Sequence, residues 1–226
     1  TPLLLVYTSG TTGKAKGSVL TQAAIAANAA NAHDMHAMTA EDVILTTLPM
    51  FHVGGLNIQT LPALACGARV LLHPRFDAGD TLAAIARDQP TLTVQVPATL
   101  QALLAHPAWS STPLHSLRAV ATGSTDVPIA LIDAIHARGV PVIQVYGATE
   151  TAPIAIYQRI DDAFTSVGSI GRPGPRTEIR LVDGAGRDVG LDTPGEILVR
   201  GAHVARGYWR DDAATAASFS DGWFRS

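Results

Sequence analysis

The segment Thr8-Ser9-Gly10-Thr11-Thr12-Gly13-Lys14-Ala15-Lys16-Gly17 follows the apolar run Leu3-Leu4-Leu5-Val6-Tyr7 near the start of the chain. Its glycines allow the backbone to approach an oxyanion closely, and its hydroxyl groups can donate hydrogen bonds to that anion. Lys14 and Lys16 are the only lysines of the chain, and every other basic residue is an arginine. We interpret the segment as a core strand that leads into a polyphosphate-binding loop.

This loop differs from the Walker loop, which requires a glycine, four residues and then Gly-Lys-Ser/Thr. Here Gly13-Lys14 is followed by Ala15, and Thr8 occupies the position of the first glycine. A tight turn or a flexible linker is the other interpretation, but the preceding strand and the placement of the lysines favour an anion site. We therefore expect a phosphate loop of a non-Walker type.

The composition indicates a globular protein. The chain has 226 residues, a net charge of −3 and 47% hydrophobic residues, so it can bury a substantial core. The absence of a basic cluster argues against a nucleic acid partner, and no apolar run reaches the length of a membrane span. The single cysteine, Cys66, suits a cytoplasmic location. Both ends of the chain look cut, because it starts without methionine and stops without a polar tail.

Apolar runs alternate with helical stretches through the first two thirds of the chain, which predicts an α/β fold with a mostly parallel sheet flanked by helices. The expected strands cover residues 43–45, 69–72, 91–96, 117–121 and 141–146. Thr21 is expected to cap a helix that runs to about Met38. After Gly168, glycine and proline become frequent, and short strands at 178–182 and 196–199 predict a small β-rich subdomain. We therefore expect an α/β unit at residues 1–167 and a β-rich unit at 168–226.

Ligands of open parallel sheets bind beyond the carboxyl ends of the strands. Four loops lie at such positions, namely the Gly/Lys loop and residues 51–55, 123–125 and 146–151. In the last of these, Glu150 is a candidate Mg²⁺ ligand, because this cation takes one or two carboxylates beside phosphates. A surface turn is the alternative for Glu150. Tyr146 could stack on a base or belong to the core.

Three stretches of the chain together resemble the adenylate-forming superfamily of acyl-CoA synthetases, luciferases and peptide-synthetase adenylation domains. They are residues 7–13 with Lys16-Gly17, residues 146–151, and residues 195–201 with Gly207-Tyr208. The resemblance covers essentially the whole chain. It implies that a carboxylic acid is activated with ATP and Mg²⁺ to an acyl-adenylate, and that the acyl group is then passed to a thiol, here that of CoA.

The resemblance also implies roles for individual residues. The β- and γ-phosphates of ATP would be held by Thr8, Ser9, Gly10, Thr11, Thr12, Gly13 and Lys16. Thr149 would contact a phosphate and Glu150 the metal, so these two and Lys16 are the candidate catalytic residues. The adenine and acyl sites would be lined by Gly123, Ser124 and Gly147, with Tyr146 flanking the base. His52, Val53, Gly54 and Gly147 would face the acyl group.

The sequence departs from the family pattern at two places. Ala15 stands where the family usually has proline, which should loosen the exit of the loop without removing a ligand. The chain stops at Phe224-Arg225-Ser226, before the expected ribose-binding aspartate. We therefore expect a fragment that lacks the family's N-terminal portion and its C-terminal domain with the catalytic lysine. Such a fragment should be inactive alone.

His52 gives partial information on the acyl substrate. Peptide-synthetase adenylation domains have an aspartate there, which pairs with the amino group of an amino acid, whereas an imidazole offers no such counter-charge. A fatty or aryl acid is therefore favoured, although His52 could also be a hydrogen-bonded core residue. A peptide-synthetase adenylation domain and a non-catalytic nucleotide-binding module remain the alternatives. His33 and His36 lie three apart on a helix, and we expect them to be solvated histidines rather than metal ligands.

Overall fold

The computed structural model describes residues 1–8 and 15–226. Six residues of the predicted phosphate loop, including the candidate ligands Ser9, Gly10, Thr11, Thr12 and Gly13, lie outside the described residues. Thr8 and Lys16 lie on either side of that gap. They are paired across an antiparallel ribbon, so the two ends of the loop are close together.

The ribbon consists of β1 (Pro2–Thr8) and β2 (Lys16–Thr21), which form a sheet of their own. The expectation that the first apolar run is a core strand is therefore wrong. Leu3, Leu5 and Tyr7 are exposed, and Val6 is buried. Because successive side chains of a strand point to opposite faces, a ribbon that is covered on one side leaves alternate residues of β1 at the surface.

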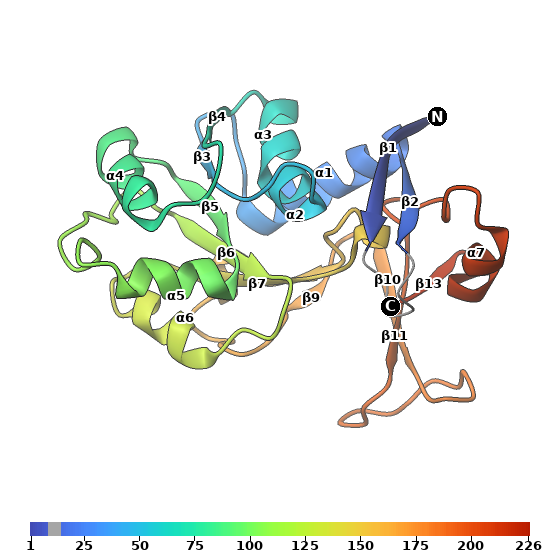
Figure 1. Cartoon of the computed structure of the whole chain (residues 1–226). Helices are drawn as coiled ribbons and strands as arrows, with labels where there is room; N and C mark the ends of the chain where they lie inside the picture. The colour runs from blue at the N-terminus through green and yellow to red at the C-terminus, as the bar shows by residue number, and fades with distance from the viewer. Residues whose placement is uncertain (9–14) are drawn as a thin grey trace.

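A seven-stranded sheet forms the centre of the molecule (Figure 1). In spatial order its strands are β4 (Arg69–Leu72), β3 (Val43–Thr46), β5 (Leu92–Gln95), β6 (Ala119–Gly123), β7 (Val142–Tyr146), β8 (Ile156–Tyr157) and β9 (Arg172–Pro173). The first five are parallel, and β8 and β9 join antiparallel. The sequence-based expectation of a mostly parallel sheet is confirmed, and the sheet extends past residue 167 through β9.

Helices cover both faces of this sheet (Figure 1). One face carries α1 (Gln22–His36) and a continuous helical stretch formed by α2 (Val53–Gly55), the π-helical turn η1 (Leu56–Thr60) and α3 (Leu61–Cys66). The other face carries α4 (Ala78–Asp88), α5 (Pro97–Ala105) and α6 (Ile129–His136). The strands supply alternate side chains to two cores, with Ile44 and Val94 in the first and Leu45 and Val120 in the second.

The amino end of α1 is fixed as the sequence predicts. The Thr21 side chain accepts a 3.0 Å hydrogen bond from the backbone N–H of Ala24, which satisfies a helix donor that would otherwise lack a partner. The helix ends at His36, two residues before the expected position, where Ala37 adopts a left-handed conformation. None of the helices within residues 1–8 and 15–226 combines the length and the apolar character of a membrane span.

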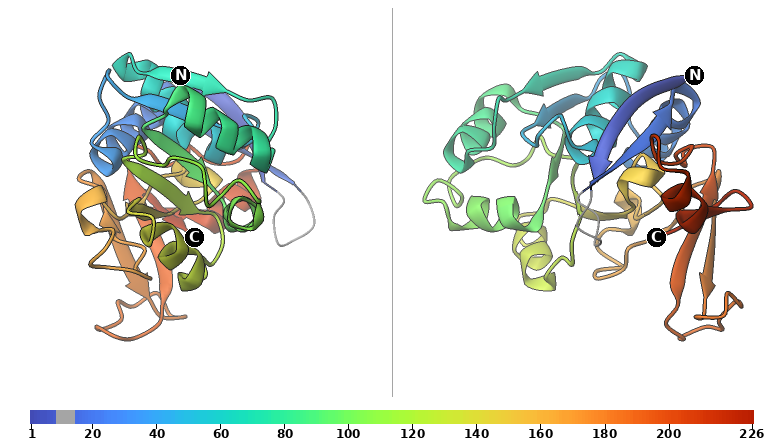
Figure 2. Two further views of the ribbon diagram at one scale, coloured as in Figure 1. Left: turned by 90° about the vertical axis from the view of Figure 1, so that its left-hand side faces the viewer. Right: turned by 45° about the vertical axis from the view of Figure 1, so that its right-hand side comes forward.

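A second, antiparallel sheet lies beside the β1–β2 ribbon (Figures 1 and 2). It contains β10 (Thr177–Val182), β11 (Glu196–Gly201), β13 (Trp223–Arg225) and β12 (Phe219–Ser220), with α7 (Asp212–Ser218) packed next to it. Two short 3₁₀ turns, η2 (Thr149–Thr151) and η3 (Ile160–Asp162), lie in the connections that precede this sheet. The connection between β10 and β11 projects away from the body of the molecule in both views of Figure 2.

Candidate functional site

A pocket of about 370 Å³ lies at the carboxyl ends of β5, β6 and β7. It is closed on one side by the loop that leads into α2. Seven of the sequence-predicted site residues line it: His52, Val53, Gly54, Gly123, Ser124, Gly147 and Thr149. The position agrees with the rule for open parallel sheets, and residues separated by almost one hundred positions meet in one cavity.

The wall of this pocket is mostly apolar. Its apolar side chains come from β5, β7, α2, η1 and the loops beside them: Leu48, Val53, Ile58, Val94, Val96 and Val145. Sequence analysis named only Val53 of this set. The others were detectable in principle, because Val94 in β5 and Val145 in β7 both face the first core of the central sheet. A wall of this kind suits the hydrocarbon part of a ligand, with the polar atoms at the rim fixing its orientation.

The loop after β6 brings its backbone very close to β7. A Cβ atom at Gly123 would overlap the carbonyl oxygen of Val145, so glycine is needed there for packing of the two strands. The next residue, Ser124, has a left-handed φ of 79°. A non-glycine residue in this region is uncommon and often belongs to a functional loop. Gly123 and Ser124 therefore form a tight, fixed border of the pocket.

Glu150 and Lys16 do not line this pocket but meet around a third residue, Tyr208. Glu150 lies in η2 with 7% of its surface exposed, and the Tyr208 hydroxyl donates a 2.7 Å hydrogen bond to its Oε1. The Lys16 Nζ lies 4.8 Å from the centre of the Tyr208 ring, within cation–π distance. Burial and the neighbouring Glu150 raise the pKa of the Tyr208 hydroxyl, so it stays a donor.

Tyr208 was part of a motif in the sequence, but no role was assigned to it there. The two remaining candidates of the nucleotide site lie apart from the pocket wall. The Thr8 hydroxyl donates to the carbonyl oxygen of Lys16 at 3.4 Å, across the base of the loop. The Tyr146 ring packs against the small cluster formed by Ala155, Ile156 and Val199. Its predicted place beside the base stays a prediction.

Glu150 is the one carboxylate that the sequence predicts for the metal site. Within the described residues no group of three or more histidine, cysteine, aspartate or glutamate side chains could hold a metal ion. Mg²⁺ in phosphate sites keeps several waters and usually takes one or two carboxylates together with the phosphates. The donor set therefore fits an Mg²⁺ ion that arrives with a polyphosphate, and does not fit an ion bound by protein groups alone.

The expectation that His33 and His36 are solvated is wrong for His36. It is fully buried, its Nδ1–H donates to the carbonyl oxygen of Ala32 at 2.8 Å, and its Nε2 accepts from the Gln59 amide at 3.0 Å. Burial lowers its pKa to about 4. His33 contacts the carbonyl oxygen of Pro62 at 2.9 Å. Both histidines connect α1 to the helical stretch beside it, because their side of α1 faces that stretch.

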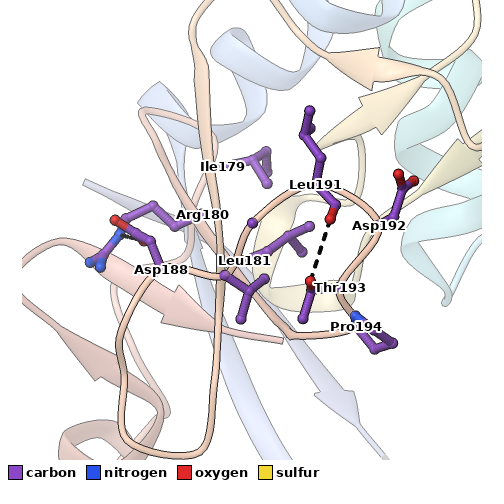
Figure 3. Close-up of a pocket in the computed structure, with 10 residues that line it drawn as sticks. Ile179, Arg180, Leu181, Asp188, Leu191, Asp192, Thr193 and Pro194 are labelled. Carbon is purple, nitrogen blue, oxygen red and sulfur yellow. Dashed lines mark hydrogen bonds and ion pairs between the residues drawn. The ribbon is translucent and has the colours of Figure 1, made fainter.

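A larger pocket, of about 730 Å³, lies between β10 and residues 188–194 (Figure 3). Its wall includes Ile179, Leu181 and Leu191, the last of which is 97% exposed. Two of its charged groups, Arg180 and Asp188, are paired at 2.7 Å and lie at one side of the pocket, and a third, Asp192, lies on another side (Figure 3). None of the sequence-predicted site residues lies there. Size alone does not make it the functional site, because no reactive groups converge on it.

Comparison with known proteins decides the family. Residues 1–209 match the family model described as AMP-binding enzyme. The chain belongs to this family. Among curated proteins it is 55% identical to indoleacetate–CoA ligase of Aromatoleum aromaticum over 226 residues, which is all of this chain and 44% of that protein. It is 38% identical to feruloyl-CoA synthase of an Amycolatopsis species over 99% of this chain and 45% of that protein.

Solved structures of this AMP-binding family share the fold. O-succinylbenzoate coenzyme A synthetase of Bacillus subtilis, solved in complex with ATP and a magnesium ion, has a TM-score of 0.89 and 32% identity. That match covers 98% of this chain and 46% of the other. The N-terminal domain of FACL13 from Mycobacterium tuberculosis has a TM-score of 0.91 and 29% identity, over 100% and 56% of the two chains. The resemblance found in the sequence is confirmed, and the chain spans less than half the length of these curated relatives.

Proposed function

We propose that the full-length protein is an acid–CoA ligase that depends on ATP and Mg²⁺. A carboxylate oxygen of the acid attacks the α-phosphorus of ATP, the bond from that phosphorus to the bridging oxygen breaks, and pyrophosphate leaves. The CoA thiolate then attacks the acyl carbonyl and releases AMP. The observation that carries the proposal is the apolar pocket at the strand ends. Gly123, Ser124 and Thr149 lie at its rim, together with His52 from the loop that leads into α2.

The residues of this chain would act mainly by placing charge. Transfer of a nucleotidyl group needs in-line positioning and neutralisation of the phosphate oxygens more than a covalent nucleophile. We assign Lys16 and Thr149 to the phosphates and Glu150 to the metal, as the family resemblance implies. The described ends of the loop support this assignment, because the pairing of Thr8 with Lys16 closes the loop at its base.

The acid that we propose is an aryl carboxylic acid. The names of the two curated relatives refer to indoleacetate and ferulate, which are aromatic acids. The apolar side chains of Ile58, Val94 and Val145 suit an aromatic ring. His52 lines the same pocket and offers no counter-charge for an α-ammonium group, which argues against an amino acid. A fatty acid is the next candidate for this pocket.

Two other functions remain open to experiment. A peptide-synthetase adenylation domain would use an amino acid and a carrier thiol in place of CoA. A non-catalytic module would bind ATP without releasing pyrophosphate. A small-molecule acid, ATP and CoA are the partners of the favoured function. We place the protein in the cytoplasm, where these substrates are available.

Pyrophosphate release by the full-length protein separates the three functions. The assay should compare indoleacetate, ferulate, long-chain fatty acids and amino acids, each with and without CoA. We expect release with aryl acids and formation of the aryl-CoA product. Release with amino acids alone would reject the acyl-CoA function, and no release with any acid would favour the binding module. Lys16→Ala should lower pyrophosphate release, and an unchanged rate would remove Lys16 from its assigned role.

A further inference from the structure

Tyr208 lies between two oppositely charged side chains that the proposed function places at the phosphates and the metal. Its hydroxyl donates to Glu150 Oε1 at 2.7 Å, and the Lys16 Nζ lies 4.8 Å from its ring centre. The side chain is itself buried, with 7% of its surface exposed. Lys16 and Glu150, which are far apart in the sequence, are therefore connected through the side chain of Tyr208.

The backbone around Tyr208 makes the same connection. In the segment 205–209, the N–H of Ala205 donates to the carbonyl oxygen of Glu150 at 2.7 Å. The N–H of Trp209 donates to the carbonyl oxygen of Gly17 at 2.7 Å, next to Lys16. The segment therefore joins η2 to β2, and the backbone on both sides of Tyr208 is held by hydrogen bonds.

We propose that Tyr208 is a positioning residue that fixes the Glu150 carboxylate and the Lys16 ammonium for binding of ATP with its Mg²⁺ ion. The proposal rests on the proposed function, in which Glu150 meets the metal and Lys16 a phosphate. Tyr208 contacts neither ligand itself. It acts on both through the two residues that it holds.

The chemistry of Glu150 explains why such a residue is needed. A nearly buried carboxylate is costly unless it is hydrogen-bonded, and a carboxylate that is free to rotate binds a metal less well than one that is fixed. The hydrogen bond from the Tyr208 hydroxyl occupies Oε1 of Glu150 and thereby sets the orientation of its second oxygen, Oε2. The hydroxyl thus plays the part of the partners that orient ligating carboxylates in metal sites.

The ring of Tyr208 has a separate effect on Lys16. Among the described residues neither Lys16 nor Glu150 takes part in an ion pair. The ring holds the ammonium on its face and the carboxylate at its hydroxyl, so the two opposite charges stay apart. Direct pairing would neutralise both groups and reduce their attraction for phosphate and metal. Loss of the ring should therefore weaken nucleotide binding with or without metal, whereas loss of the hydroxyl alone should weaken only the metal-dependent part.

The test uses the full-length protein and a non-hydrolysable ATP analogue, with calorimetric titration in Mg²⁺ and in EDTA. We expect Tyr208→Phe to raise the Kd of the Mg²⁺ complex roughly tenfold, as for loss of a hydrogen bond to a charged group, and to leave the metal-free Kd unchanged. Tyr208→Leu should raise both Kd values. In the double variant with Glu150→Gln, the Phe substitution should add no further loss, because its effect passes through Glu150.

Tyr157→Phe is the matched control. The Tyr157 hydroxyl donates to the Asp34 carboxylate at 2.6 Å, so this variant also removes a tyrosine–carboxylate bond, but away from the pocket. It should leave both Kd values unchanged. Equal binding of the Mg²⁺ complex by Tyr208→Phe and the wild type would overturn the inference alone. So would equal losses with and without Mg²⁺, or additive losses with Glu150→Gln. No binding of the analogue by the wild type would overturn the proposed function and this inference with it.

Discussion

The backbone of Pro153 fills the space beside Gly147: a Cβ atom at position 147 would overlap the Pro153 carbonyl oxygen and lie 2.7 Å from the Thr151 hydroxyl. That hydroxyl already donates to Pro153 and accepts from the N–H of Ala148. Gly147→Ala must therefore displace the loop between β7 and η2, which borders the pocket. We expect a loss of about 1–3 kcal/mol in the free energy of unfolding, measured by urea denaturation.

Gly184→Ala is the control for this effect. A Cβ atom at Gly184 would meet nothing within 4 Å, and the residue lies in an exposed turn. The free energy of unfolding of Gly184→Ala should stay close to that of the wild type. Equal stability of Gly147→Ala and the wild type would contradict the packing argument, and Gly147 would then have to be explained by contact with a ligand.

Gly54 offers a way to change the size of the pocket at the strand ends. It lines the pocket, and a Cβ atom added there would meet nothing within 4 Å. Gly54→Val should fold normally and reduce the space for the acid. If the proposed function is correct, KM for a bulky aryl acid should rise roughly tenfold or more, because each methylene in such a pocket changes binding by about 1–3 kcal/mol. KM for a short acid should change little. Equal changes for both acids would show that Gly54 does not border the acyl group.

The central strands, the loops that follow them and the cap of α1 could be predicted from the sequence, because local residue patterns determine them. The runs around Val43 and Val142 supply apolar side chains to both cores because helices cover both sides of the sheet, whereas in β5 the apolar Leu92 and Val94 alternate with polar residues. The loops that follow the strands line the candidate site, so Gly123 and Thr149 could be named in advance as residues of this pocket. The Thr21 cap also depends only on neighbouring residues.

The parts that sequence analysis missed depend on contacts between distant segments. The run from Leu3 to Tyr7 has the composition of a core strand, but its partner is β2, and the ribbon is covered on one side only. His36 looked solvated because the helical periodicity does not show that Gln59 lies against it. A role for Tyr208 could be inferred only from the fold, which places its side chain between Lys16 and Glu150. In each case the deciding partner belongs to another element of the chain.

Buried neutral histidines make the stability of this protein depend on pH. Burial lowers the pKa of His36 to about 4, and the nearby Arg118 and His33 act in the same direction while Asp42 opposes them. Between pH 6.5 and about 4 the unfolded chain binds a proton that native His36 does not, so stability falls as the pH falls. The pKa of His203 is also lowered to about 4 by burial, and it adds to the effect.

Urea denaturation at pH 7 and pH 4.5 measures this dependence. We expect a loss of about 3 kcal/mol for each histidine at most over this range, since one pKa unit corresponds to about 1.4 kcal/mol. His36→Gln keeps a polar side chain that can hydrogen-bond and removes the titrating group. The difference between the two pH values should be smaller in this variant. An unchanged difference would show that His36 is not the source of the effect.

Asp42 and Arg118 form hydrogen bonds that connect several elements at the edge of the sheet opposite the pocket. The Arg118 guanidinium donates to both carboxylate oxygens of Asp42, at 3.1 and 3.0 Å, and also to the carbonyl oxygen of His36. Thr91 donates to the same carboxylate at 2.6 Å. Burial tends to raise the pKa of Asp42, but the bonds from Arg118 and Thr91 outweigh it and lower that pKa below its usual value.

Asp42→Asn should therefore lower the free energy of unfolding by about 1–3 kcal/mol at pH 7, because it weakens charge-assisted hydrogen bonds to the carboxylate of a buried residue. A depressed carboxylate pKa contributes stability above pH 3.8, which is lost as the pH falls further, so the two proteins should converge in strong acid. Asp88→Asn, which breaks the exposed pair with Arg87, should change little at either pH. Nucleotide and acid binding should be unaffected by Asp42→Asn, since the pocket lies at the opposite edge of the sheet, and a selective loss of binding would contradict this separation of stability from function.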